Sequence, residues 1–236
     1  MNRSTINLNL GDCMDAMREM PDNAYDLAIV DPEYGRGEHG GVNRSGLVTQ
    51  KNGSKKMVKG GGQYKKKGWD CKPAGSDYFN EVIRVSKNQI IWGCNYYGAN
   101  FGSGRIIWDK CNEGSDQSDC EIAYNSLTNR VDLFRYMWRG MMQGKSVSEG
   151  HVMQGNKQLN EKRIHPTQKP VKLYKWLLTN YAKPNDKILD THAGSFSIGI
   201  ACHDLGFDLD AWEIDAEYHA AATKRFEQHK AQLQLF

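Results

Sequence analysis

The feature that most restricts the fold of this chain is a short apolar run that stops abruptly at polar residues. Ala28-Ile29-Val30 is followed directly by Asp31-Pro32-Glu33-Tyr34, which brings an acid, a proline, a second acid and an aromatic ring. A parallel strand buried on both faces has this kind of apolar run, and ligands of open α/β sheets bind beyond the carboxyl ends of such strands. The run therefore indicates a catalytic strand end, with an ordinary Asp-Pro turn as the alternative.

Strand-like and helix-like segments alternate along the rest of the chain. Hydrophobic periodicity predicts strands at 6–10, 25–30, 89–92, 105–108, 121–124, 131–136, 187–190 and 210–213, and helices at 13–20, 76–85, 171–181, from Ser195 to about 205, and at 216–232. This alternation predicts an α/β fold, with an open, mostly parallel sheet and helices on both faces. We expect the first two strands to form a parallel pair, and the strands at 121–124 and 131–136 to form a hairpin near the sheet edge. The length of 236 residues fits a single domain, 1–236.

Two polar stretches interrupt this pattern, at about 36–75 and about 139–164. Residues 36–68 hold nine Lys or Arg against one acid, a local charge of +8 in a chain whose formal net charge is +3. A concentrated basic segment beside a catalytic strand favours a polyanionic partner, and a solvated linker is the alternative. The candidate phosphate contacts in this segment are Arg36, Arg44, Lys65, Lys66 and Lys67.

Composition argues against several other classes of protein. No apolar run approaches the length of a membrane span, and the N-terminus does not have the pattern of a signal peptide, so we expect a cytoplasmic protein that does not contact membranes. The six cysteines are scattered without a C-x-x-C pair, and therefore we expect reduced thiols and no metal ion.

A second constellation lies near the C-terminus. Asp190-Thr191-His192-Ala193-Gly194-Ser195 is followed by a predicted helix and then by a strand that ends in Glu213. A turn of small residues lets the backbone approach a ligand, and an acid one βαβ unit later can bind both hydroxyls of a ribose. The G-x-G-x-x-G pattern and a P-loop lysine are both absent, which favours a nucleoside cofactor without a pyrophosphate.

Three motifs together resemble the DNA amino-methyltransferases, which methylate exocyclic amines of adenine or cytosine. These are Asp31-Pro32-Glu33-Tyr34, His165-Pro166-Thr167-Gln168-Lys169-Pro170 and the segment 190–195. Their order, with the catalytic motif first and the cofactor loop last, resembles the permuted beta class. The resemblance implies a Rossmann-like fold, S-adenosylmethionine as cofactor and double-stranded DNA as substrate. It also suggests a homodimer.

The resemblance also implies a role for individual residues. Asp12 would meet the adenine of the cofactor and Glu213 its ribose. Asp190, Gly194 and Ser195 would meet its amino-acid end. Thr167 and Lys169 match the segment that closes over its methionine portion, and Asp31 is a further cofactor-binding candidate.

For catalysis, Asp31 and the main-chain carbonyl of Pro32 would accept hydrogen bonds from the target amine, and Tyr34 would stack on a base flipped out of the duplex. Aspartate at the first position of the tetrapeptide favours adenine, with N4 of cytosine as the alternative.

Two positions depart from the family pattern. Glu33 stands where the family normally has proline, and Phe196 stands where the cofactor loop normally has a second glycine. We expect Glu33 to loosen the loop and to bring a carboxylate close to Asp31, and Phe196 to place a bulky side chain where the backbone should approach the cofactor. These departures keep open a further alternative, a catalytically degenerate methyltransferase-like module that binds nucleic acid or a partner subunit.

Overall fold

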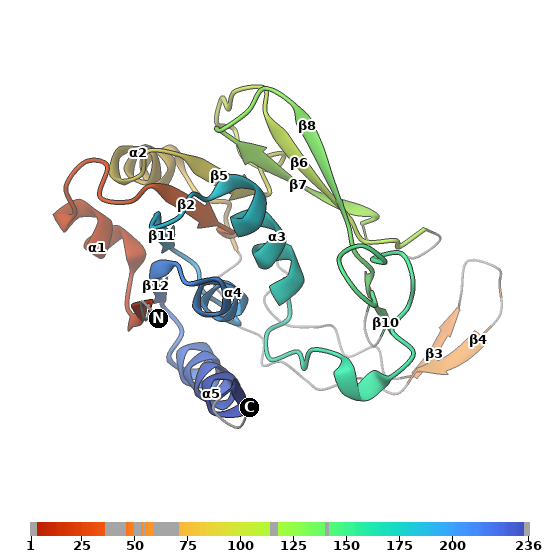
Figure 1. Ribbon diagram of the computed structural model, residues 1–236. Helices are drawn as coiled ribbons and strands as arrows, with labels where there is room; N and C mark the ends of the chain where they lie inside the picture. The colour runs from red at the N-terminus through yellow and green to blue at the C-terminus, as the bar shows by residue number, and fades with distance from the viewer. Residues whose placement is uncertain are drawn as a thin grey trace.

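The main sheet of the computed structural model has eight strands and helices on both sides (Figure 1). The structure describes residues 4–35, 46–49, 53, 55–58, 71–113, 118–139 and 142–233. The strands lie in the order β1 (Ile6–Leu10), β12 (Asp208–Glu213), β11 (Lys187–Asp190), β2 (Leu27–Val30), β5 (Gln89–Trp92), β7 (Cys120–Asn125), β6 (Arg105–Asp109) and β8 (Val131–Arg135). Among these strands β7 is antiparallel to both of its neighbours and the other pairs are parallel, which confirms the predicted open, mostly parallel sheet.

Two predicted strand pairings were wrong. β1 and β2 are not neighbours, because β12 and β11 lie between them. β7 and β8 do not form a hairpin: β6 lies between them, pairing antiparallel with β7 and parallel with β8. In both cases the strands themselves were predicted, but a strand's neighbour is decided by contacts between distant parts of the chain.

Helices α1 (Cys13–Glu19) and α2 (Ser76–Val85) cover one face of the sheet. On α2, Tyr78, Phe79, Val82 and Val85 are buried at helical spacing, whereas Ile83 is half exposed. Helices α3 (Val171–Tyr181), α4 (Ser197–Leu205) and α5 (Ala216–Leu233) pack on the other face.

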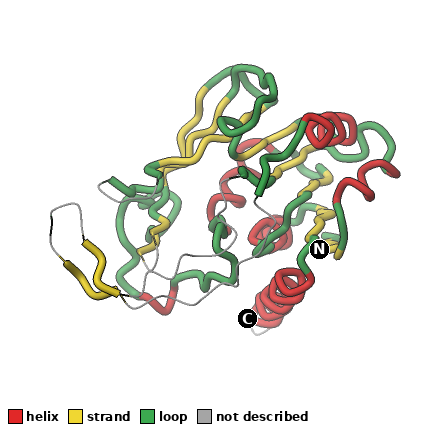
Figure 2. The backbone as a smooth tube through the Cα atoms, turned by 180° about the vertical axis from the view of Figure 1, so that it is seen from behind, coloured by secondary structure: helices red, strands yellow, loops and turns green. Residues whose placement is uncertain are grey.

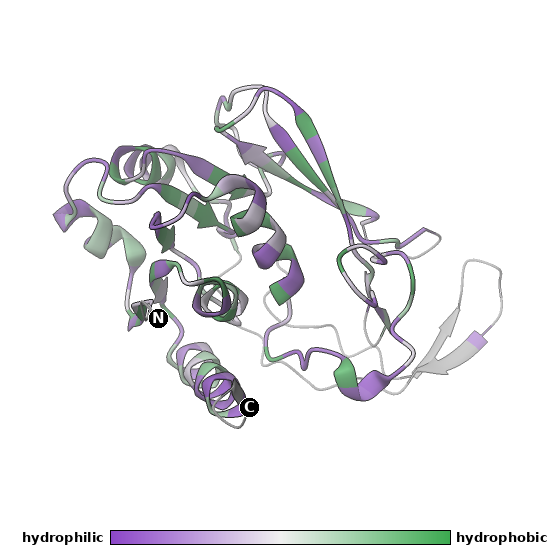
Figure 3. Cartoon of the chain, viewed as in Figure 1, coloured by the Kyte–Doolittle hydropathy of each residue, from purple (hydrophilic) through white to green (hydrophobic). Residues whose placement is uncertain are grey.

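The hydrophobic core has one part on each face of the sheet. The strands in the middle of the sheet are the most hydrophobic elements (Figure 3), and every residue of β2 and β5 is buried. A strand with helices on both faces has no solvent-facing side, so its apolar residues run continuously without alternating with polar ones. Ile29 packs with the helices α3 and α4, and Val30 packs with α1 and α2.

The adjacent strands β2 and β11 lead to opposite faces of the sheet. Along the chain, α2 is the first helix after β2 and α4 is the first after β11, and these two helices belong to the two separate parts of the core. Such a reversal separates the loops that leave two neighbouring strands, and in α/β sheets the resulting crevice is the usual position of a ligand.

The two polar stretches contain short regular elements that the sequence did not predict. β3 (Gly46–Thr49) and β4 (Lys55–Val58) pair antiparallel in a separate sheet, which lies away from the main sheet in both views (Figures 1 and 2). The second stretch carries β9 (Trp138–Arg139), β10 (Met142–Gln143) and a 3-10 turn at Lys157–Leu159. Across the described ranges, no helix has the length and apolar character needed to span a bilayer.

Candidate functional site

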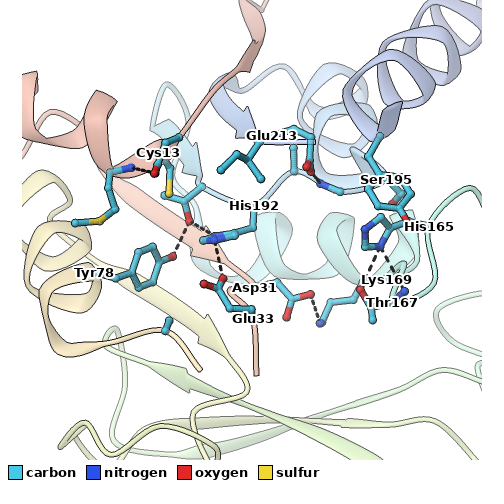
Figure 4. A pocket seen from close by; sticks show the side chains of 18 of the residues that line it. Cys13, Asp31, Glu33, Tyr78, His165, Thr167, Lys169, His192, Ser195 and Glu213 are labelled. Atoms are coloured by element: carbon cyan, nitrogen blue, oxygen red, sulfur yellow. Dashed lines mark hydrogen bonds and ion pairs between the residues drawn. The ribbon is translucent and has the colours of Figure 1, made fainter. Parts of the chain in front are cut away.

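A cavity of about 410 Å³ opens at the carboxyl ends of β1, β2, β11 and β12, the edge where the two faces of the sheet diverge. Its volume is within the range of pockets that hold a ligand of drug or cofactor size. Figure 4 shows side chains from both halves of the chain pointing into it. The labelled wall residues are Cys13, Asp31, Glu33, Tyr78, His165, Thr167, Lys169, His192, Ser195 and Glu213.

One end of the cavity is formed by Asp12 and Glu213, the two residues that the family resemblance assigns to the adenine and the ribose of the cofactor. Asp12 caps helix α1, because its carboxylate accepts the Met14 N–H at 2.8 Å. Glu213 is buried at the end of β12, where Oε2 accepts the N–H of Gly194 at 2.8 Å and Oε1 accepts that of Asp215 at 2.8 Å. Both carboxylates are therefore oriented by backbone N–H groups, which leaves further lone pairs on each to accept hydrogen bonds from a ligand.

The loop after β11 supplies the wall beside Glu213. Gly194 has a φ of +49°, which a residue with a side chain rarely adopts, and together with Ser195 it lines the cavity. The hydroxyl of Ser195 is 3.1 Å from that of Ser197, and its carbonyl accepts a hydrogen bond from Arg225.

Asp190 does not line the cavity, although the family resemblance implied that it contacts the cofactor. It is almost completely buried below the wall, where its carboxylate accepts the N–H of His192 at 3.0 Å. Burial raises the pKa of Asp190 to about 7. Through this hydrogen bond it is connected to the loop that carries His192 and Gly194.

The expectation that Phe196 obstructs the cofactor loop was wrong. Phe196 has a φ of +58°, and its ring packs in the core against Phe226 with 5.3 Å between the centroids. A Cβ atom at Gly199 would lie 2.4 Å from this ring, so the glycine on α4 provides the space for it. The left-handed backbone conformation directs the side chain away from the cavity.

The opposite end of the cavity is a buried network of charges around Lys169. Its ammonium donates to Asp31 and lies 3.0 Å from Oε2 of Glu121 on β7, and Lys110 also contacts Glu121. Burial alone would lower the pKa of Lys169, but Asp31 and Glu121 outweigh it and raise that pKa. Burial would raise the pKa of Glu121, but the positive charges of Lys169 and Lys110 outweigh it and hold that pKa well below its usual range. Glu121 was not predicted, because no local motif connects β7 with the site.

Tyr34 is held tightly beside Asp31. Its hydroxyl donates to Asp31 Oδ1 at 2.5 Å, and one face of its ring is stacked with Tyr96 at a centroid distance of 4.9 Å. A Cβ atom at Gly93 would lie 2.2 Å from the ring, so Gly93 allows the backbone of that turn to approach Tyr34. The Pro32 carbonyl, the second predicted amine acceptor, accepts the hydroxyl of Tyr97 at 3.0 Å.

Glu33, which was expected to bring a second carboxylate close to Asp31, instead contacts His192. Its carboxylate lies 3.0 Å from Nε2 of His192, while Asp31 turns toward Lys169 and Tyr34. Burial would raise the pKa of Glu33, but the hydrogen bond and charge of His192 lower it. Burial would lower the pKa of His192, but the hydrogen bond and charge of Glu33 raise it.

The His165–Pro170 segment approaches the cavity from a third side. Thr167 and Lys169 line it, and the hydroxyl of Thr167 lies 3.2 Å from Nδ1 of His165. The ring of His165 in turn packs edge-on against Tyr218 on α5. His165 and His192 were not named as site residues, although both occur within the motifs that carried the prediction.

Tyr78 on α2 and the segment 72–75 complete the wall. They belong to none of the predicted motifs, so the sequence offered no local signal for them. The predicted phosphate contacts Arg36, Arg44, Lys65, Lys66 and Lys67 lie outside the described residues.

The sequence of this chain is similar to those of known DNA methyltransferases. The DNA methylase family model (N6_N4_Mtase) matches residues 108–224. The type II methyltransferase M.HinfI of Haemophilus influenzae is 24% identical over 248 residues, covering 93% of this chain and 68% of that protein.

Solved structures show the same fold. The structure of the M1.HpyAVI–SAM complex has a TM-score of 0.53 at 16% identity, covering 94% of this chain and 100% of that one. The cytosine-N4-specific PvuII DNA methyltransferase has a TM-score of 0.52 at 13% identity, covering 98% of this chain and 92% of that one. These likenesses confirm the Rossmann-like methyltransferase fold that the sequence predicted.

Proposed function

The chain belongs to the DNA amino-methyltransferases, and we propose that it methylates the exocyclic N6 amine of adenine in double-stranded DNA, with S-adenosylmethionine as cofactor. The observation that carries this proposal is the arrangement within one cavity. Two oriented carboxylates, Asp12 and Glu213, stand at one end, and Asp31 stands at the other. The carbonyl of Pro32, which follows Asp31 in the chain, lies behind the lining and accepts the hydroxyl of Tyr97.

The residues present fit the cofactor. Glu213 is a buried carboxylate at the end of β12, the position from which an acid binds ribose hydroxyls. Asp12 lies at the same end and is suited to accept a hydrogen bond from an adenine amine, and the positive φ of Gly194 leaves room for close approach of a ligand. Thr167, Lys169 and Ser195 supply polar groups for an amino-acid end. When bound, S-adenosylmethionine supplies a methyl group that its sulfonium already activates.

The chain itself has to position the exocyclic amine of the target base, which is a poor nucleophile. The lone pair of an exocyclic amine is delocalised into the base, so acceptors that take both of its hydrogens favour a pyramidal, reactive nitrogen. Asp31 and the Pro32 carbonyl are such acceptors, since each oxygen can accept more than one hydrogen bond. The nitrogen loses one proton as it gains the methyl group, and Asp31 is the adjacent carboxylate that can take it. Tyr97 fixes the Pro32 carbonyl by donating to it.

The DNA substrate and the choice of adenine rest on different observations. A target base must leave the duplex to reach Asp31, and the basic stretch 36–75 remains the candidate for phosphate contacts. Adenine is favoured by aspartate at position 31. The likeness to the cytosine-N4-specific PvuII enzyme favours cytosine as the second candidate.

Incubation with labelled S-adenosylmethionine and unmethylated duplex DNA, followed by mass spectrometry of the nucleosides, tests the proposal. We expect N6-methyladenine from the wild-type protein, and none from Asp31→Ala, which removes an acceptor. Asp77→Asn, which changes an exposed carboxylate on α2, is the control and should retain activity. N4-methylcytosine would reassign the base, and absence of any methylated nucleoside from folded wild-type protein would refute the enzyme.

A further inference from the structure

Glu33 and His192 connect two loops that leave adjacent strands. β2 and β11 are parallel neighbours, paired at Ile188 with Leu27 and at Leu189 with Ala28. Glu33 follows β2 and His192 follows β11, and the contact between their side chains spans the gap at the carboxyl edge of the sheet. Figure 4 shows both side chains pointing toward each other within the cavity wall.

The contact continues into a chain of hydrogen bonds that reaches helix α2. The Nδ1 atom of His192 is 2.9 Å from the Thr191 hydroxyl, which is 2.6 Å from the hydroxyl of Tyr78. With the proton of neutral His192 on Nε2, Tyr78 donates to Thr191, Thr191 donates to Nδ1, and Nε2–H donates to Glu33. Every hydrogen in this chain then has an acceptor, and the geometry also accommodates the imidazolium form, with Nδ1–H donating to Thr191.

The position of Glu33 makes this contact relevant to the target amine. Glu33 is next to Pro32, whose carbonyl is a proposed amine acceptor, and two residues after Asp31, the other one. Proline at position 33 would restrict the backbone through its ring, whereas glutamate leaves φ free. A side-chain tie to the neighbouring loop is a different way of restricting the same backbone.

We propose that Glu33 and His192 are a positioning pair that fixes the Asp31–Pro32 acceptors relative to the cofactor loop. The proposal rests on the proposed methyl transfer, which requires the amine nitrogen and the methyl donor to be aligned. Neither side chain touches the reacting atoms in this role. Loss of the pair therefore lowers the rate of methyl transfer much more than it weakens cofactor binding, since Asp12 and Glu213 at the far end of the cavity are unchanged.

Other ionisable groups lie near the pair and interact with it through their charges. Asp190 and Glu213 act on His192 through their charges. The charge of Glu33 in turn raises the pKa of the hydroxyl or thiol groups of Cys13 on α1, Tyr78 on α2 and Tyr97 after β5. Each of these groups stays in place when Glu33 alone is replaced. A change in the titration of His192 in a Glu33 variant therefore reports on the removed carboxylate.

The test compares Glu33→Ala, Glu33→Gln and Glu33→Pro with the wild-type protein. Glu227→Gln on α5, which changes another ion-paired glutamate on the surface, is the matched control. For Glu33→Ala we expect kcat to fall on the order of 100-fold, as for a misplaced reacting group, with the KM for cofactor nearly unchanged. Glu33→Gln should recover most of kcat, because the amide oxygen still accepts from Nε2. Glu33→Pro should not, because proline restricts φ at position 33 but does not tie the Asp31–Pro32 acceptors to the loop that carries His192.

NMR titration of His192 supplies a readout that does not need turnover. We expect the pKa of His192 to fall in Glu33→Ala, since burial then acts without the carboxylate, and to stay in place in Glu227→Gln. An unchanged titration, or a kcat of Glu33→Ala or Glu33→Pro equal to that of an active wild type, would overturn the positioning pair. A wild-type protein without methyl transfer would refute the proposed function and the positioning role with it, while a shifted titration would still show that the two side chains interact.

Discussion

Replacing Asp190 with asparagine should make the protein more stable at neutral and alkaline pH. The carboxyl is buried below the cofactor loop, and its pKa is raised from 3.8 to about 7. Because the pKa of Asp190 is higher in the folded protein than in the unfolded chain, the folding stability is highest below the unfolded pKa. It falls as the pH rises through the pKa of the folded state. At about 1.4 kcal/mol for each pKa unit, wild-type protein at pH 8 has lost about 4 kcal/mol. Asparagine carries no charge and can still accept the His192 N–H at the same position.

Urea unfolding at pH 5 and pH 8 measures this effect. The stability advantage of Asp190→Asn over wild type should grow by about 3 kcal/mol between these two pH values, because wild-type stability falls over most of that interval. Asp77→Asn on the surface of α2 reports the effect of removing an exposed carboxylate. An advantage that is independent of pH, or a variant that is less stable at pH 8, would refute the view that Asp190 is a buried, destabilising carboxyl.

Two further variants probe the other end of the cavity. Lys169→Met leaves Asp31 and Glu121 buried without their shared cation, so we expect a loss of about 3–5 kcal/mol in unfolding free energy and no methyl transfer; a loss below 1 kcal/mol in urea unfolding would argue against the network. Tyr96→Ala exposes the face of the Tyr34 ring that Tyr96 covers, which gives a flipped base a larger stacking surface and should lower the KM for DNA; an unchanged KM would show that a flipped base does not use that face.

The elements of the fold were predictable because their signals are local. The apolar runs of β2, β5 and β11 and the amphipathic pattern of α2 appear in a few consecutive residues. The order of the strands is not local, since β1 pairs with a strand about 200 residues later. For this reason the strands were found while the predicted β1–β2 and β7–β8 pairings were wrong.

The same limit applies within the site. Asp31, Thr167, Lys169 and Glu213 were found through motifs, and each lines the cavity. The effect of Phe196 depends on a positive φ, a backbone state that residue type alone rarely indicates. Glu33 was expected to act on Asp31, which is close in the sequence, but the residue that it contacts is His192, on the loop that follows β11.

The central claim, that the cavity between the ends of β1, β2, β11 and β12 is the cofactor site of a methyltransferase, is tested most directly by calorimetry. S-adenosylmethionine titrated into wild-type protein should bind with one molecule per chain, and Glu213→Ala should weaken that binding at least about tenfold, since losing a hydrogen-bonding charge typically costs more than about 1.4 kcal/mol. Glu227→Ala on α5 is the control and should bind like wild type. Absence of binding to folded wild-type protein, or equal binding by Glu213→Ala, would contradict the account.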